Sequence, residues 1–209
     1  MIKAIVCDDH PIFREGLKKI IGQSRDITVT EEVSDGLALM EKLRGPRFDV
    51  IILDISLPGV NGLDILKDLR TAGKATPVLI LSMHPEEQYA VRALRAGASG
   101  YVAKASVPEE LLAAIRKVAA GRKYVSPSLA EQLASELDGS SEKPPHERLS
   151  DREFQIMRMI ASGRKVKEIA ADLCLSPATI GTYRARILSK LNLQSNAELI
   201  HYTIENKLT

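Results

Sequence analysis

The sequence predicts an α/β domain with a doubly wound, five-stranded parallel sheet, followed by a small all-α domain. In the first 122 residues, short apolar segments alternate with amphipathic ones, which is typical of strands and helices wound around a parallel sheet. From residue 148 onward the apolar spacing is helical throughout. We therefore expect domains over 1–122 and 148–209, joined by a linker over 123–147 that is helical in part.

Each expected strand is short, apolar and bounded by turn residues or polar side chains. The expected strands are 2–7, 27–33, 50–53, 77–81 and 100–103. Segments 50–53 and 78–81 are apolar at every position, which indicates interior strands covered on both faces. The second strand contains Thr and Glu, so we expect it at an edge of the sheet.

Helical spacing follows each of these strands. The expected helices begin near Pro11, Gly36, Leu63, Pro85 and Pro108. Gly22, Gly97 and Gly121 are placed to end three of them. Because crossovers between parallel strands are right-handed, few strand orders are compatible with this alternation.

Side chains with useful chemistry stand at the carboxyl ends of four expected strands. They are Asp8 and Asp9 after the first strand, Asp54 after the third, Ser82 after the fourth, and Tyr101 and Lys104 in or just beyond the fifth. Open α/β sheets bind their ligands at this edge. If the first and third strands are neighbours, three carboxylates converge there, and they would repel one another strongly. A hard cation such as Mg²⁺ removes that repulsion, because carboxylates, waters and phosphate oxygens are its preferred ligands.

This constellation, with Leu57-Pro58-Gly59 after the third strand, resembles the receiver domain of two-component response regulators over about residues 1–122. The resemblance implies a flavodoxin-like fold in which Asp54 accepts a phosphoryl group from the phosphohistidine of a sensor histidine kinase. It also implies that Mg²⁺ is held by Asp8, Asp9, Asp54 and the backbone carbonyl of Ser56.

The same resemblance assigns roles to the residues of the fourth and fifth strands. Lys104 would pair with the phosphoryl group, and Ser82 would swing to hydrogen-bond it. Tyr101 would move inward with Ser82 and so alter the face made by the fourth helix, the fifth strand and the fifth helix.

Two other functions compete with this interpretation. A phosphatase of the haloacid dehalogenase type uses an aspartyl nucleophile on a similar sheet, with a second acid two residues later as general acid and base. Here that position is Ser56, so the proton shuttle is missing and we expect no enzyme. The remaining alternative is a DNA-binding regulator whose receiver-like domain responds to a ligand or protein partner without phosphorylation.

The charge of the chain is asymmetric. Ten Lys/Arg and six Asp/Glu lie from Arg148 onward, for a net charge of +4, which leaves nineteen basic and twenty-one acidic residues before it. The C-terminal part is thus basic, and the part before Arg148 is mildly acidic. This asymmetry favours double-stranded DNA as a partner of the C-terminal part.

Helix caps organise the C-terminal part. Ser150 stands three residues before Glu153, a capping box that begins a helix ending at Gly163. A short second helix follows from Val166, and Ser176 caps a third. The second and third helices resemble a helix-turn-helix, whose second member enters the major groove. A fourth helix opens after Ser195.

The third of these helices, 177–191, has two distinct faces at about 100° per residue. Its core face carries Ile180, Tyr183, Ile187, Leu188 and Leu191. Arg184 falls inside this apolar arc, so we expect a carboxylate partner, Glu153 or Glu168. The opposite face and the start of the second helix supply the expected DNA contacts, which are Lys165, Lys167, Thr179, Gly181, Thr182, Ala185, Arg186 and Lys190.

The segment from Leu149 to about Lys207 resembles the NarL/LuxR-type output domain, on the residues Leu149-Ser150-Asp151-Arg152-Glu153, Lys167-Glu168-Ile169-Ala170, Thr179-Ile180 and Lys190-Leu191. This resemblance implies DNA binding as a homodimer when the protein is active. Gly181 and Val166 depart from the family's usual lysine and asparagine.

The location of the protein follows from what the sequence lacks. The N-terminus enters a strand directly, and no apolar run approaches about eighteen residues, so we expect neither a signal peptide nor a membrane partner. Cys7 and Cys174 are far apart in apolar surroundings, and we expect both to be reduced core residues of a cytoplasmic protein.

Overall fold

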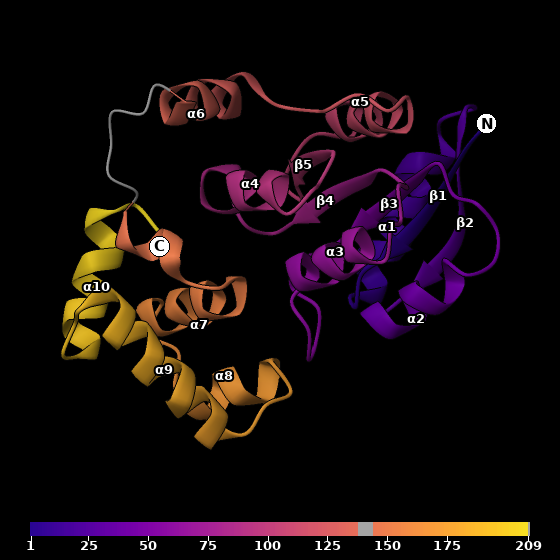
Figure 1. Cartoon of the computed structure of the whole chain (residues 1–209). Coiled ribbons are helices and arrows are strands. Elements are labelled where there is room, and N and C mark those ends of the chain that lie inside the picture. The colour runs from indigo at the N-terminus through magenta and orange to yellow at the C-terminus, as the bar shows by residue number, and fades with distance from the viewer. Residues whose placement is uncertain (138–143, 209) are drawn as a thin grey trace. The chain divides into compact units, whose positions relative to one another are not determined.

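The structure is a computed structural model that describes residues 1–137 and 144–208 (Figure 1). The chain divides into two compact units, Met1–Ser135 and Glu136–Thr209. The expected linker, 123–147, includes residues 138–143, which lie outside the described residues. Within the part of the chain that is described, no helix is long and apolar enough to cross a membrane.

The first unit is built on a five-stranded, fully parallel sheet. Its strands are β1 Ile2–Cys7, β2 Ile27–Val33, β3 Val50–Leu53, β4 Val78–Ser82 and β5 Gly100–Ala103. Their order is β2-β1-β3-β4-β5, and every neighbouring pair is parallel. The prediction that the first and third strands are neighbours is confirmed, and so is the prediction that the second strand lies at an edge of the sheet.

Helices cover both faces of this sheet (Figure 1). One face packs against α1 Pro11–Gly22 and α5 Pro108–Ala119, whose apolar residues form one buried cluster with alternate residues of the strands. On the other face lie α2 Gly36–Lys42, α3 Gly62–Thr71 and α4 Glu86–Arg95. Because both faces are buried, β3 and β4 are apolar at nearly every position, as parallel strands require.

A further helix, α6 Pro127–Leu137, begins in contact with the first unit. The Ser126 hydroxyl donates a 2.6 Å hydrogen bond to Glu86 Oε1 on α4, and the Ser128 hydroxyl donates to the same oxygen. Leu129 is buried, and Tyr124 bridges to Gly100 at the β5 edge. The start of the expected linker therefore packs on the sheet domain.

The second unit is all-helical, as expected. After the 3₁₀ turn η1 Pro145–Arg148 come α7 Asp151–Ala161, α8 Val166–Asp172, α9 Pro177–Leu191 and α10 Asn196–Glu205. The Ser150–Glu153 capping box is present, and the side chains of Ser176 and Ser195 cap α9 and α10. The carbonyl oxygens of Leu173 and Leu208 accept hydrogen bonds from Arg152 and Arg158, which tie α7 to the segments that follow α8 and α10.

The expectation that both cysteines lie in the core is wrong for Cys174. Cys7 is buried in β1, where burial raises the pKa of its thiol and keeps it protonated. Cys174 is exposed and has a positive φ of 52° in the turn after α8. That left-handed turn directs its side chain outward, while the neighbouring Leu173 is buried instead.

Candidate functional site

The edge formed by the carboxyl ends of the strands brings the predicted acids together. Cys7 of β1 pairs in register with Leu53 of β3, so Asp8 and Asp54 leave adjacent strands at the same level. The backbone amide of Asp54 donates a 2.9 Å hydrogen bond to the Cys7 carbonyl oxygen, which holds the two strand ends side by side. The predicted convergence of the acidic side chains is present in the structure.

Asp54 is almost completely buried, with 2% of its surface exposed. Its Oδ1 accepts a 3.2 Å hydrogen bond from the Ser56 amide, and its Oδ2 accepts one of 2.8 Å from Lys104 Nζ. The same ammonium lies 2.5 Å from Asp8 Oδ2, so Lys104 joins both carboxylates. Burial raises the pKa of Asp54, and the Lys104 ammonium opposes that rise.

The connection after β3 has a steric reason to contain glycine. A Cβ added at Gly62 would lie 2.1 Å from the Asp54 carbonyl oxygen, and the Gly62 amide donates a 2.8 Å hydrogen bond to the Ile55 carbonyl. The Asn61 side chain, also buried, accepts from the Leu63 amide at 2.8 Å and caps α3. The start of α3 thus packs directly against the backbone of Asp54, and only glycine permits this approach.

The acidic cluster offers ligand atoms for a cation. One ligand atom from each of Asp8, Asp9, His10 and Asp54 lies within 4.8 Å of all the others. The three carboxylates provide the hard oxygen donors that Mg²⁺ prefers. The imidazole Nδ1 of His10 lies 2.9 Å from Asp9 Oδ1 and 3.3 Å from Asp8 Oδ1, so this side chain already interacts with two of the acids. The donor chemistry fits Mg²⁺.

Ser82 and Tyr101 each form a hydrogen bond with the backbone of His84, which lies in the connection between β4 and α4. The His84 amide donates a 3.2 Å hydrogen bond to the buried Ser82 hydroxyl, and the Tyr101 hydroxyl donates one of 2.7 Å to the His84 carbonyl. The His84 ring stacks on Tyr89 with centroids 4.8 Å apart, and its Nε2 lies 3.4 Å from Ser56 Oγ. Tyr101 already occupies an inward position, since only 1% of its surface is exposed.

Sequence reasoning missed two residues of this site. His84 connects Ser56, Ser82 and Tyr101, and the only signal for it was its position two residues after Ser82. The ring of Phe13 covers the Lys104 ammonium, and nothing in the local pattern distinguished Phe13 from an ordinary core residue.

In the second unit, α9 presents the two faces that its sequence predicts. Ile180, Ile187, Leu188 and Leu191 are buried. Of the expected DNA-contacting residues, those that are exposed are Lys165, Lys167, Gly181, Thr182, Ala185, Arg186 and Lys190, while Thr179 is half-buried. A Cβ added at Gly181 would meet no atom within 4 Å, so this part of the surface is open.

Two basic side chains near α9 are engaged in ion pairs. Arg164 contacts Asp172, and Lys190 Nζ lies 2.6 Å from Glu153 Oε2, whose side chain is buried. Burial raises the pKa of Glu153, but Lys190 and the hydrogen bonds from Ser150 outweigh it, and the net pKa lies below the usual value. Lys165 and Lys167 remain exposed at the start of α8.

The expectation that Arg184 pairs with Glu153 or Glu168 is wrong. Its Nε donates a 2.6 Å hydrogen bond to Asn196 Oδ1 at the start of α10. Arg184 is half-buried rather than enclosed, because its long side chain reaches the rim of the apolar face. A neutral amide there satisfies the guanidinium without a carboxylate.

Two families match the chain. Residues 4–116 match the family described as response regulator receiver domain. Residues 147–203 match the family described as bacterial regulatory proteins, luxR family.

Similar proteins cover nearly the whole chain. The response regulator UvrY of Escherichia coli K12 is 36% identical over 209 residues, which cover 100% of this chain and 96% of that relative. The response regulator GacA of Pseudomonas aeruginosa is 36% identical over 200 residues, covering 95% and 94%.

Solved structures of response regulators also match the chain over nearly its full length. The response regulator ChrA of a heme-sensing two-component system is 32% identical, with a TM-score of 0.54 over 100% of this chain and 98% of the other. RcsB of Salmonella enterica serovar Typhimurium, bound to the rprA promoter in the presence of the phosphomimetic BeF₃⁻, is 26% identical, with a TM-score of 0.66 over 97% and 98%. RcsB dimers have also been solved on DNA.

Proposed function

The chain belongs to the two-component response regulators that join a receiver domain to a LuxR-type DNA-binding domain, and we propose that Asp54 is its phosphoacceptor. Members of this family are phosphorylation-dependent, DNA-binding regulators of transcription. In this chain, Asp54 would be the acceptor, Lys104 and Ser82 would contact the phosphoryl group, and Tyr101 would be the switch residue.

The observation that carries the proposal is the double contact of Lys104. Its ammonium bridges Asp54 and Asp8 at the edge where the parallel strands end. A lysine in this position can pair with a phosphoryl oxygen formed on Asp54 after only a small movement of its flexible stem. The buried Ser82 hydroxyl accepts a hydrogen bond from the His84 amide, and its own proton is available for a second phosphoryl oxygen.

The transfer itself needs one bond made and one broken. A carboxylate oxygen of Asp54 attacks the phosphorus of a phosphohistidine, a P–O bond forms and the P–N bond breaks. The electron pair of the broken bond leaves with the imidazole nitrogen. A proton on the other ring nitrogen of the phosphohistidine lets the donor leave as a neutral imidazole. A general acid two residues after Asp54 would favour rapid hydrolysis, but Ser56 stands there, so we infer a regulator rather than an enzyme.

A bound cation belongs to this proposal. Asp8, Asp9, Asp54 and the carbonyl of Ser56 would hold Mg²⁺, which supplies positive charge for the phosphoryl oxygens during transfer. Lys104 would then share Asp8 and Asp54 with the cation, and its ammonium would be freer to pair with the phosphoryl group.

The second unit is proposed as the output. Arg186 and the small side chains around it on α9 would enter the major groove of double-stranded DNA, with Lys165 and Lys167 on phosphates. RcsB dimers bind DNA, and a homodimer of this chain would present two such helices to paired half-sites. The partners are then a sensor histidine kinase, DNA and a second copy of the chain, and the site of action is the cytoplasm.

The experiment that tests the proposal uses the full chain. Incubation with Mg²⁺ and phosphoramidate, followed by intact-mass measurement, is expected to add one phosphoryl group. Asp54→Asn should add none, and omission of Mg²⁺ should slow the reaction strongly. An unmodified wild-type protein, or an equal adduct on Asp54→Asn, would sink the assignment. Sedimentation before and after phosphorylation then measures the expected dimer.

A further inference from the structure

The ammonium of Lys104 is enclosed on two sides. Asp8 and Asp54 contact it from one side, at 2.5 and 2.8 Å. On another side lies the ring of Phe13, whose centroid is 4.3 Å from Lys104 Nζ. This distance lies well within the range in which the face of an aromatic ring attracts a cation. Only 3% of the Lys104 side chain remains exposed.

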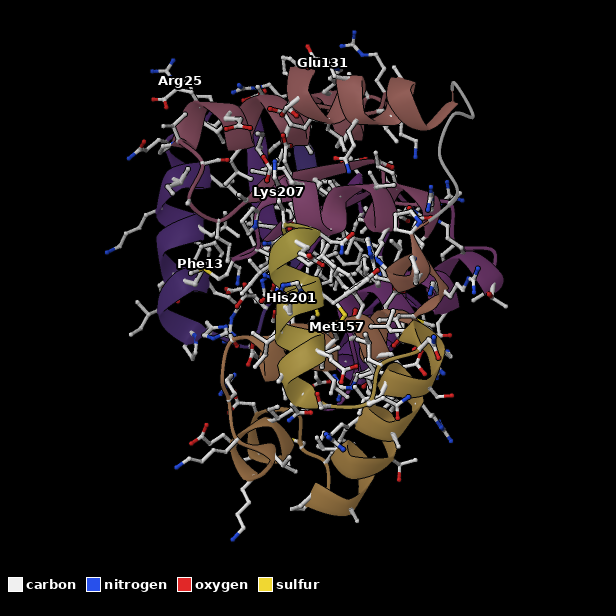
Figure 2. All side chains as sticks on the ribbon, turned by 90° about the vertical axis from the view of Figure 1, so that its left-hand side faces the viewer. Phe13, Arg25, Glu131, Met157, His201 and Lys207 are labelled. Atoms are coloured by element: carbon white, nitrogen blue, oxygen red, sulfur yellow. The ribbon has the colours of Figure 1, made fainter. Side chains whose placement is uncertain are left out.

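Phe13 reaches Lys104 from α1 rather than from the edge of the sheet. Pro11 begins this helix, and Phe13 follows in its first turn, half-buried and packed against the cluster beneath the sheet. Figure 2 labels Phe13 on α1. The ring therefore belongs to the core on one side and to the Lys104 environment on the other.

A cavity of about 320 Å³ lies between α1 and α5, and both Phe13 and Lys104 contribute to its lining. The other lining side chains are mostly apolar, including Leu17, Ile20 and Leu111, and no carboxylate is among them. A smaller residue at position 13 would widen this space beside the lysine. The Lys104 stem could then take other rotamers, and water could reach the ammonium from behind.

The attraction between a cation and a ring is stronger when the cation is removed from bulk solvent, and the Lys104 side chain is only 3% exposed. Leucine would fill much of the same volume but offers no negative ring face to the ammonium. A lysine has a long stem with many rotamers, so a contact that restricts them keeps the charge where the phosphoryl oxygen forms. The Phe13 ring supplies such a contact.

We propose that Phe13 is a positioning residue for the phosphoryl chemistry of Asp54, because its ring covers the Lys104 ammonium and holds it toward that carboxylate. This inference rests on the proposed phosphorylation of Asp54. Phe13 touches neither reacting group and acts through Lys104. The ring excludes water from the inner side of the ammonium and limits its movement into the cavity between α1 and α5.

The first test compares rates of phosphorylation of the full chain by phosphoramidate with Mg²⁺. Phe13→Leu is expected to react about fivefold more slowly, which corresponds to a cation–π contact of ordinary strength. Phe13→Tyr keeps the ring and should stay within about twofold of wild type. Ile20→Ala enlarges the same cavity without touching Lys104, and it should also stay within about twofold.

Two results would overturn the proposal directly. A Phe13→Leu protein that reacts as fast as wild type would show that the ring is dispensable. Equal slowing of Phe13→Leu and Ile20→Ala would assign the effect to packing of α1 rather than to the contact with Lys104. Thermal unfolding of each variant shows whether the fold is intact, and Phe13→Tyr reports on the ring even where Phe13→Leu is destabilised.

A double-mutant comparison asks whether Phe13 acts through the lysine. In a Lys104→Met background the reaction should be slow, and Phe13→Leu should slow it no further. A second fivefold loss in that background would mean that Phe13 acts independently of Lys104, against the proposal.

A spectroscopic measurement separates this inference from the proposed function. The ring should shift the Lys104 side-chain proton resonances upfield in wild type and Phe13→Tyr, and this shift should vanish in Phe13→Leu. If the shift is present but wild type takes no phosphoryl group, the function assigned to Asp54 fails. If wild type is phosphorylated but the shift is absent, the positioning role of Phe13 fails on its own.

Discussion

The hydroxyl of Tyr101 donates a 2.7 Å hydrogen bond to the backbone carbonyl of His84. Through this bond the buried end of β5 holds the connection between β4 and α4, whose first residues also contact Ser82 and Ser56. The phosphoacceptor environment and the start of α4 are thus joined by one short polar network.

Tyr101→Phe is expected to loosen this connection. The His84 carbonyl would lose a hydrogen bond that contributes about 1 kcal/mol, and more if no water replaces it. Amide exchange at residues 83, 84 and 86 should quicken by roughly fivefold, while amides in β1 should exchange as in wild type. Unchanged protection at residues 83, 84 and 86 would show that the hydroxyl does not hold the segment.

Asp54→Asn should stabilise the first unit at neutral pH in the absence of divalent cations. Burial raises the pKa of Asp54 above that of an unfolded chain, so the native state binds more protons between the two values. The stability contributed by this group therefore falls as pH rises through its folded pKa, and the ionised carboxylate is costly at pH 7.

Urea unfolding of wild type and Asp54→Asn, followed at β1 and β3 amides, measures this difference. The variant should be more stable than wild type at pH 7, and this gain should shrink as pH approaches 4. Added Mg²⁺ should favour wild type. A variant less stable than wild type at pH 7 would contradict this account.

Glu86 should control the order of the first turn of α6. Glu86→Ala removes the shared acceptor of Ser126 and Ser128, and the Ser126 hydroxyl also caps this helix by accepting from the Leu129 amide at 3.1 Å. Hydrogen exchange near residue 129 is expected to rise about fivefold, the scale of a weakened N-cap. The control is Glu87→Ala, which removes an exposed carboxylate from α4, the helix that also carries Glu86. This variant should leave the exchange near residue 129 unchanged.

Lys190→Ala should lower the free energy of unfolding of the second unit by about 1 kcal/mol. The effect is no larger because Lys190 is partly exposed, so solvent screens its attraction to Glu153. The loss arises because the buried Glu153 carboxylate would keep its charge without its cation. The net pKa of Glu153 is lowered, so the stabilisation from this pair is present above about pH 4.5 and is lost as pH falls further. Urea unfolding at pH 7 and pH 3.5 measures this difference. An equal effect at both pH values would mean that the ion pair is not its source.

Arg186→Ala should weaken DNA binding by roughly ten- to a hundredfold if the guanidinium reads a base edge. The probe is a duplex selected by the phosphorylated wild-type protein from a random pool. Arg25→Ala removes the same charge from an exposed site in the first unit and serves as the control. Equal weakening on selected and unrelated duplexes, with a salt slope reduced by about one, would assign Arg186 to phosphate instead.

Much of the architecture could be predicted because its signals are local. Apolar strands closed by polar residues, the Ser150–Glu153 capping box and the two faces of α9 each depend on residues within a few positions of one another. The convergence of Asp8 and Asp54 needed only one further assumption, the adjacency of two parallel strands.

The predictions that were wrong, and the contacts that were missed, involve the charged ends of long side chains and residues that are far apart in the sequence. The periodicity of α9 placed Arg184 on the apolar arc, but its guanidinium reaches Asn196 at the start of α10. Glu153, expected near Arg184, accepts from Lys190 instead. Helical periodicity fixes the direction of a Cβ, but three or four further torsions decide which neighbour the charged group meets.

The sequence by itself determined which residues would stand at the carboxyl edge of a parallel sheet and which would face outward on α9, because the periods of strands and helices follow from backbone geometry. Only the tertiary structure decided that Lys104 would join Asp8 to Asp54, that Phe13 would cover the ammonium, and that His84 would meet Tyr101. These contacts join segments that are distant along the chain, and their geometry depends on how α1, β4 and β5 pack around the end of β3.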